Sequence, residues 1–357
     1  MHAKQGGVAV VTALLLTTLA ITIVASLFWQ QQVQVRSIEN QRYQLQKKWV
    51  LRGALDWASL ILREDARTSG AVDHLGEPWA VNLGDTRLDQ YVENGKTDVE
   101  DSDATLSGKI SDAQAKFNLT NLASGGEVDQ RELEAFMRLL ANLKIDTAQA
   151  TGLALQVAQT QDRSEKTEKS TEPGVTGPQP SSAEGTGAAP SNPGSSGQTT
   201  TKTSATNPVP DLISTTTVNS TVQFLKFSQV DDLLAIPGFT PEIVAKLKNY
   251  VTVLPVRTPI NVNTTTAEVL SARLENVSMT EAALMIAQRD RAFFRDFVQF
   301  QLNFPDKVKA SAKQDVSFSS NYFIVNGRVR LNRSFLEVNS LIERNGQRSQ
   351  ILWVKEN

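Results

Sequence analysis

Cysteine is absent from the 357-residue sequence, and histidine occurs only at His2 and His74. The lack of cysteine excludes disulfide bonds and thiolate metal sites. Because His2 lies in the short N-terminal leader, a histidine zinc site or a serine–histidine–aspartate triad would depend on His74. We therefore predict that the protein is not an enzyme.

An excess of charge of either sign is also missing. The 36 Lys and Arg residues nearly balance the 38 Asp and Glu residues, which gives a formal net charge of −2. Because nucleic-acid-binding domains are usually strongly basic, this balance argues against nucleic acid as a partner.

The N-terminus carries a long hydrophobic run. The residues Val8–Trp29 include no charged side chain; Lys4 precedes the run and Arg36 is the next basic residue. As a helix, the run would be about 33 Å long, enough to cross the hydrocarbon core of a bilayer. Three interpretations are open: a secretory signal cleaved near Val24-Ala25-Ser26, an unprocessed membrane anchor, or a processed helix that also takes part in assembly.

The helical pattern continues beyond the hydrophobic run. No proline occurs between Gln30 and Arg67, and apolar residues recur at helical spacing, at Leu51, Leu55, Ala58 and Leu62. We predict one helix over residues 8–66, whose first half lies in lipid and whose second half packs on a soluble domain.

A stretch of low complexity divides the rest of the chain. Of the 49 residues 173–221, 32 are Ser, Thr, Pro or Gly, and none is aromatic. Such a composition cannot bury enough apolar surface to offset the entropy of ordering. We predict a disordered linker over about residues 162–221, with helices before it at 133–159.

The segment after the linker has the pattern of tandem helix–hairpin–helix units. Pro237, Gly238 and Phe239 form the predicted hairpin, and Thr240-Pro241 begins the next helix. Such units bind the DNA backbone in many proteins. Residues 225–304, however, contain eight basic and eight acidic side chains, and a neutral module is a poor phosphate binder. We therefore predict a structural hairpin with Gly238 at positive φ.

The C-terminal region changes to an alternating pattern. Apolar residues at positions 318, 322, 324, 329 and 331 stand among polar ones, and Asn345-Gly346 is typical of a hairpin between two further strands. We predict an α+β fold, in which an antiparallel sheet packs on the long N-terminal helix and an all-α domain is inserted between early and late strands.

Four motifs stand out along the chain. They are a leader that ends in Gly7, a Glu-x-Trp segment in "DHLGEPWAVNL" (73–83), a Phe-Asn-Leu-x-x-Leu segment in "KISDAQAKFNLTNL" (109–122) and the Ile-Asn-Val-Asn-Thr segment at 260–264. Together they resemble the motifs of the type II secretion minor pseudopilin K family. The resemblance implies a pilin-like fold whose inserted helical domain contains helix–hairpin–helix-like units. The expected divisions are leader 1–7, transmembrane helix 8–29, pilin-like helix and first strands 30–122, inserted domain 123–305 and C-terminal strands 306–357.

The resemblance also implies processing. In pilins and pseudopilins, a prepilin peptidase cuts after a glycine, here Gly7, and the new N-terminal residue, here Val8, is methylated. Most pilins carry glutamate at the fifth mature position, where this chain has Thr12. A carboxylate at membrane depth is costly, whereas the Thr12 hydroxyl can bond back to the carbonyl of Val8. We expect this residue to suit a subunit at the end of a filament.

No cofactor is expected from the residues. Family members commonly bind calcium in the helical insertion, near an Asp-Trp-x-Asp segment, but the corresponding region here reads "QTQDRSEKTEKS". The acidic cluster at residues 98–103 lacks the spacing of an EF-hand loop. We therefore assign no metal ligands.

The function implied by the resemblance is that of a minor pseudopilin at the tip of the type II secretion pseudopilus. The implied partners are minor pseudopilins I and J, and indirectly H and the major pseudopilin G, together with the prepilin peptidase and the inner-membrane assembly platform. The implied location is the inner membrane, with the globular part in the periplasm. Two alternatives remain: a membrane-tethered protein that binds nucleic acid through its helix–hairpin–helix units, and an unprocessed single-pass anchor protein.

Overall fold

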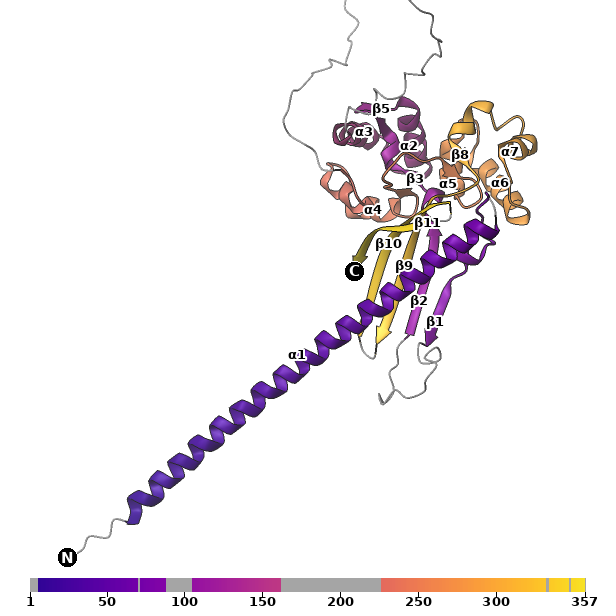
Figure 1. Cartoon of the computed structure of the whole chain (residues 1–357). Coiled ribbons are helices and arrows are strands. Elements are labelled where there is room, and N and C mark those ends of the chain that lie inside the picture. Colours follow the sequence, from indigo (N-terminus) through magenta and orange to yellow (C-terminus); the bar gives the residue numbers. More distant parts are fainter. Residues whose placement is uncertain are drawn as a thin grey trace, which may run out of the picture.

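The protein, described here as a computed structural model, has three parts (Figure 1). A long helix forms a rod, an antiparallel sheet lies beside the C-terminal half of the rod, and a helical domain lies beyond its end. The structure describes residues 6–69, 71–87, 105–161, 226–331, 334–346 and 348–356.

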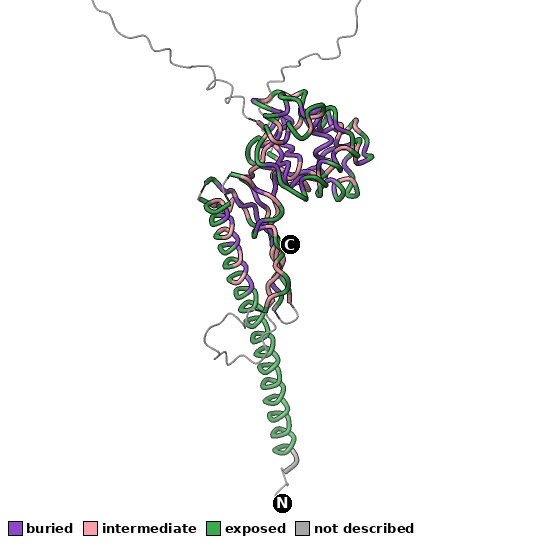
Figure 2. Tube along the Cα trace, turned by 90° about the vertical axis from the view of Figure 1, so that its right-hand side faces the viewer, coloured by how far each residue is buried: buried purple, intermediate pink, exposed green. Residues whose placement is uncertain are grey.

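The rod is helix α1, Gly6–Thr68, which matches the helix predicted over 8–66 within two residues at each end. Its N-terminal half is exposed along its whole surface, whereas its C-terminal half buries one face against the sheet (Figure 2). The buried apolar residues of α1 are the ones that recur at helical spacing in the sequence, at Leu51, Leu55, Ala58 and Leu62, and each is at most 5% exposed.

The sheet contains five antiparallel strands in the order β1-β2-β9-β10-β11. Leu55, Leu62, Trp79, Phe323 and Ile342 form the centre of the cluster between α1 and the sheet, where the rings of Trp79 and Phe323 meet edge to face at 5.2 Å. Gly346 follows β10 with a φ of +56°, in agreement with the predicted hairpin. The strands are β1 (Leu83–Arg87), β2 (Thr105–Asp112), β9 (Tyr322–Leu331), β10 (Ser334–Asn345) and β11 (Arg348–Glu356), and the short helix η1 (Pro78–Ala80) precedes β1.

The helical domain lies between β2 and β9 in sequence and has one core. Residues before and after the linker region share this core, because β3 pairs in parallel with β6 and Phe117 lies opposite Val251. The elements before the linker region are η3 (Ala113–Ala115), β3 (Phe117–Asn118), η4 (Leu119–Leu122), β4 (Ala123–Ser124), β5 (Glu127–Val128), α2 (Gln130–Asn142) and α3 (Gln149–Thr160). Those after it are η6 (Val230–Ala235), α4 (Pro241–Leu247), β6 (Val251–Thr252), β7 (Ile260–Asn261), α5 (Ala267–Arg273), α6 (Met279–Arg291), α7 (Phe297–Asn303), η7 (Ala310–Gln314) and β8 (Val316–Ser317).

The helical domain is larger than the predicted range 123–305. Phe117, Leu119 and Leu122 belong to its core rather than to the pilin-like part, and so do Val308 and Val316. The boundaries therefore lie near residues 112 and 319 instead of 122 and 305. The sequence misplaces them because short two-residue strands, which pair with distant segments, carry too little periodicity to assign to a domain. The predicted linker, 162–221, and the acidic cluster at 98–103 lie outside the described residues.

Candidate functional site: the anchor helix and the domain junction

The first candidate region is the apolar half of α1. Among the described residues, α1 is long and apolar enough to cross a membrane, and none of its most apolar 18-residue window is buried. Large apolar side chains along Val8–Trp29 are 50% exposed or more. Exposing this much apolar surface to water is unfavourable, so the segment requires lipid or partner helices around it.

The predicted processing site lies in the first turns of this helix. Gly7 and Val8 both have helical backbone conformation, because α1 begins at Gly6. The Thr12 hydroxyl donates to the carbonyl oxygens of Val8 at 3.1 Å and Ala9 at 3.0 Å, which confirms the predicted bond back to Val8. Cleavage at Gly7 and the role of Thr12 in assembly stay predictions.

Every threonine in the apolar run satisfies its hydroxyl within the helix. The acceptors for Thr17, Thr18 and Thr22 are carbonyl oxygens three residues earlier, at 2.8–3.0 Å. A hydroxyl bonded in this way leaves no unpaired donor in lipid. The four threonine hydroxyls of the run therefore need no partner from another chain.

The second candidate region is the junction where the end of α1, the sheet and the helical domain meet. Arg344, on β10, is 6% exposed and points toward two buried carboxylates. Its Nη1 donates to Asp65 at 2.7 Å, and its Nη2 donates to both oxygens of Asp73 at 2.5 and 2.6 Å. Its guanidinium carbon lies 4.6 Å from the ring centre of Phe323. Arg344 thereby links the last turns of α1, the following loop and the sheet.

Asp112 connects the same junction to the helical domain. Its Oδ2 accepts hydrogen bonds from Asn261, Thr264 and Ser320 at 2.5–3.1 Å, and its Oδ1 accepts from the backbone N–H of Gln114 at 2.7 Å. Burial raises the pKa of Asp112 to about 6, although the hydrogen bonds from Ser320, Thr264 and Gln114 lower it. The Ile-Asn-Val-Asn-Thr segment thus supplies the donors that fasten the helical domain to β2.

Glu77 is a third buried carboxylate, close to Asp65 and Asp73. Its Oε2 accepts hydrogen bonds from the indole Nε1 of Trp79 at 2.6 Å and from the backbone N–H of His74 at 3.0 Å. Its Oε1 is buried without a hydrogen-bond partner. Burial raises the pKa of Glu77 to about 7. The Glu-x-Trp motif in the sequence is therefore a local hydrogen bond between its two side chains.

Of the predicted hairpin residues Pro237, Gly238 and Phe239, the first two are exposed and Phe239 is buried in the core of the helical domain. Gly238 has a φ of +96°, as expected, and Phe239 is 4% exposed. A Cβ on Gly238 would lie 2.1 Å from the side-chain Oε1 of Gln149 on α3, so the glycine is in close contact with its own domain. A DNA-binding hairpin must present its backbone to phosphates, and this one faces Gln149. The geometry therefore does not favour the nucleic-acid alternative.

His74 does not have the setting of a catalytic base. Its ring stacks on Phe293 with centroids 4.1 Å apart, and its Nδ1 accepts a hydrogen bond from the backbone N–H of Gly76 at 3.1 Å. Burial lowers the pKa of His74. The His74 ring therefore has a packing role: it joins the loop after α1 to Phe293 of the helical domain.

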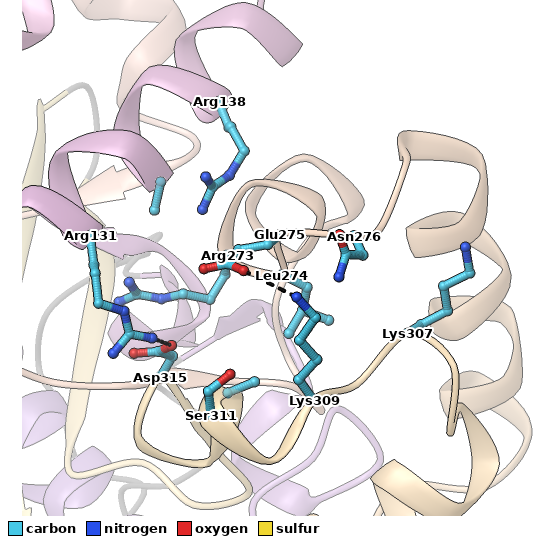
Figure 3. Close-up of a pocket in the computed structure, with 12 residues that line it drawn as sticks. Arg131, Arg138, Arg273, Leu274, Glu275, Asn276, Lys307, Lys309, Ser311 and Asp315 are labelled. Atoms are coloured by element: carbon cyan, nitrogen blue, oxygen red, sulfur yellow. Dashed lines mark hydrogen bonds and ion pairs between the residues drawn. The ribbon is translucent and has the colours of Figure 1, made fainter.

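A basic cavity lies between α2 and α5 in the helical domain (Figure 3). Its charged side chains are mostly paired within the domain: Arg131 contacts Asp315 at 2.7 Å and Lys309 lies 3.6 Å from Glu275. The cavity volume is small, about 30 Å³. These pairs and this size favour a hydrated structural cavity over a ligand site.

Sequence reasoning missed the junction. Some of its residues lie in motifs that the sequence shows: Asp73 and Glu77 belong to "DHLGEPW", and Asn261 belongs to the Ile-Asn-Val-Asn-Thr segment. Arg344 is 271 residues from Asp73 and 279 from Asp65, and no local pattern marks it as their partner.

Comparison with known proteins agrees with the architecture. The family described as "Type II secretion system (T2SS), protein K" matches residues 115–177 and 260–319. Type II secretion system protein K of Pectobacterium carotovorum subsp. carotovorum is 25% identical over 365 residues, which cover 99% of this chain and 96% of the relative. The protein K of Pseudomonas aeruginosa is 32% identical over 163 residues, and this match spans only 45% of that relative and 44% of this chain.

A solved structure has the same fold. The crystal structure of the GspK-GspI-GspJ complex from the enterotoxigenic Escherichia coli type 2 secretion system contains a chain that is 20% identical, with a TM-score of 0.60. The match covers 90% of this chain and 99% of that one. The predicted pilin-like α+β fold with an inserted helical domain is therefore confirmed.

The rod, sheet and inserted domain define a pilin-like protein whose N-terminal helix can cross a membrane. In its two matched segments, and in the relative aligned over nearly its whole length, the chain is similar to the protein K family of type II secretion systems.

Proposed function

We propose that this protein is a minor pseudopilin that caps the tip of the type II secretion pseudopilus, initiates its assembly and supports export of folded proteins across the outer membrane. It acts by occupying a position in an assembly and carries out no reaction. The observation that carries the proposal is the position of the helical domain, beyond the C-terminal end of α1 (Figure 2).

The position of this domain explains why a subunit would stop growth on one side. In a bundle of parallel rods, the next subunit above would need the space along and beyond the end of α1. The helical domain occupies that space, and the junction around Arg344 fixes it to the last turns of the rod. Subunits can therefore be added only on the membrane side.

The rod supports the membrane part of the proposal. Val8–Trp29 crosses the inner membrane and the globular part lies in the periplasm. The prepilin peptidase removes residues 1–7 and Val8 becomes the methylated N-terminus. Because residue 12 is threonine, the apolar run carries no buried acid that needs the N-terminus of a subunit above it. The Thr12 hydroxyl is hydrogen-bonded inside α1.

The proposed partners are minor pseudopilins I and J, with H and the major pseudopilin G below them and the assembly platform at the membrane. The likeness to a chain of the GspK-GspI-GspJ complex supports I and J as direct neighbours.

Removal of the helical domain tests the proposal. The side chains of Asp112 and Ser320 lie 2.6 Å apart at the two ends of the insertion, so a short glycine-rich turn can replace residues 113–319 and join β2 to β9. With a C-terminal epitope and gold-labelled antibody, the complete protein should be found at one end of each pseudopilus. The shortened protein should also be found along the fibre, and export should fall. If the gold label of the complete protein were found along the whole fibre instead of at one end, this result would contradict capping.

A further inference from the structure

Three carboxylates converge where α1 ends. One oxygen from each of Asp65, Asp73 and Glu77 lies within 4.8 Å of the other two. The three residues are 5%, 3% and 4% exposed. Buried carboxylates so close to one another repel, and their charge must be compensated within the cluster.

Arg344 compensates only part of this charge. It contacts Asp65 and Asp73, and no ion pair in the described part of the chain includes Glu77. The Oε1 atom of Glu77 is buried without a hydrogen-bond partner, whereas Oε2 is occupied by Trp79 and His74. When all three carboxylates are ionised, one guanidinium leaves two negative charges uncompensated, and Oε1 of Glu77 remains without a partner.

The chemistry of the cluster specifies the missing charge. The three groups offer only oxygen atoms, which are the ligands of hard cations. Because the three atoms lie at most 4.8 Å apart, their central point is at most about 2.8 Å from each, which admits the distance of about 2.3–2.6 Å at which Ca²⁺ binds oxygen. Ca²⁺ is commonly held by several protein oxygens, whereas Mg²⁺ usually keeps several of its waters. A divalent ion would also neutralise the two remaining charges. We propose that Asp65, Asp73 and Glu77 bind a divalent cation of the size of Ca²⁺.

The proposed ion would join the parts of the junction. Asp65 belongs to the last turns of α1, and Asp73 accepts a hydrogen bond from the backbone N–H of Ser320 at 2.6 Å. The carbonyl oxygen of Asp73 accepts another from Asn261 at 3.2 Å. An ion on these carboxylates therefore fixes the rod relative to the helical domain, and it does so independently of any role in secretion.

Terbium luminescence tests the site directly, because Tb³⁺ replaces Ca²⁺ and its emission is sensitised by a nearby indole. Trp79 lies one hydrogen bond from Glu77, so an ion in this site is close to it. The complete chain in detergent, stripped with a chelator, should show saturable emission on tryptophan excitation, and Ca²⁺ should displace Tb³⁺ at lower concentrations than Mg²⁺.

Two variants locate the ion. Glu77→Gln keeps an acceptor for Trp79 and His74 but removes a charged ligand, and should lose at least tenfold in Tb³⁺ affinity. The matched control is Asp129→Asn, a carboxylate that also pairs with an arginine, Arg257 at 2.7 Å, but lies in the helical domain. It should leave the emission unchanged.

The unfolding temperature gives a second readout. Ca²⁺ should raise the unfolding temperature of the unmodified chain and of Asp129→Asn, and should raise that of Glu77→Gln much less. The proposal is wrong if the unmodified chain shows no sensitised emission. It is also wrong if Glu77→Gln binds Tb³⁺ with the same affinity as the unmodified chain. A chain whose unfolding temperature changes with pH but not with Ca²⁺ would show that protons, rather than a cation, balance these carboxylates.

Discussion

Replacement of Arg344 by methionine should strongly destabilise the fold. Methionine keeps much of the apolar stem, so the change removes mainly the guanidinium and its bonds to Asp65, Asp73 and the carbonyl oxygen of Ser320. Removing one partner of a buried ion pair leaves an uncompensated charge and costs about 3–5 kcal/mol. Because two carboxylates lose their partner, we expect the upper part of this range at pH 7 with a chelator present.

Urea unfolding of a chain that begins at Gln30 measures this cost, since the apolar side chains of residues 8–29 are exposed and contribute little to the fold. A second variant isolates the charge effect. Arg344→Met combined with Asp73→Asn should lose less than the sum of the two single losses, because the neutral amide no longer needs a cation. A loss below about 1 kcal/mol for Arg344→Met, or strict additivity, would refute the interpretation of the junction as an ion-pair network.

Three further predictions concern stability. The raised pKa of Glu77, about 7 against an ordinary value of 4.5, means that its protonated form is favoured by the fold. With a chelator present, the contribution of Glu77 to stability should be greatest below about pH 4.5 and should fall by up to about 3 kcal/mol as the pH rises through about 7; the difference between the unmodified chain and Glu77→Gln in urea titrations at several pH values isolates it. Gly238→Ala should destabilise by about 1–3 kcal/mol, because of the positive φ and the contact with α3, whereas Gly53→Ala, inside α1 with open space around it, should stabilise by about 0.5–1 kcal/mol. Phe136→Ala should cost about 3–5 kcal/mol because this side chain is fully buried, and Leu284→Ala, at 64% exposure, should change stability by less than about 0.5 kcal/mol; equal losses would contradict the packing of the helical domain.

Local patterns predicted the elements well. The spacing of Leu51, Leu55, Ala58 and Leu62 gave the buried face of α1, and alternation gave β9, because helices and strands bury residues at their own periods. Gly238 was recognised because a tight connection before a proline-started helix needs positive φ.

Long-range contacts could not be predicted in the same way. Phe117 falls in the range predicted for the pilin-like part, 30–122, but it pairs with Val251 in the helical domain, 134 residues away. Arg344 stood in a strand pattern with nothing to distinguish it from an exposed arginine. The junction depends on which distant segments the fold brings together, and single-sequence periodicity carries no information about that.

The intact mass of the protein extracted from membranes tests the central claim most directly. As a pseudopilin, the chain should begin at Val8, with residues 1–7 removed and a methyl group on the new N-terminus. Gly7→Ala, at the predicted cleavage site, should retain the leader, whereas Gly53→Ala should be processed normally. A native protein that keeps its leader while type II secretion is active would contradict the account.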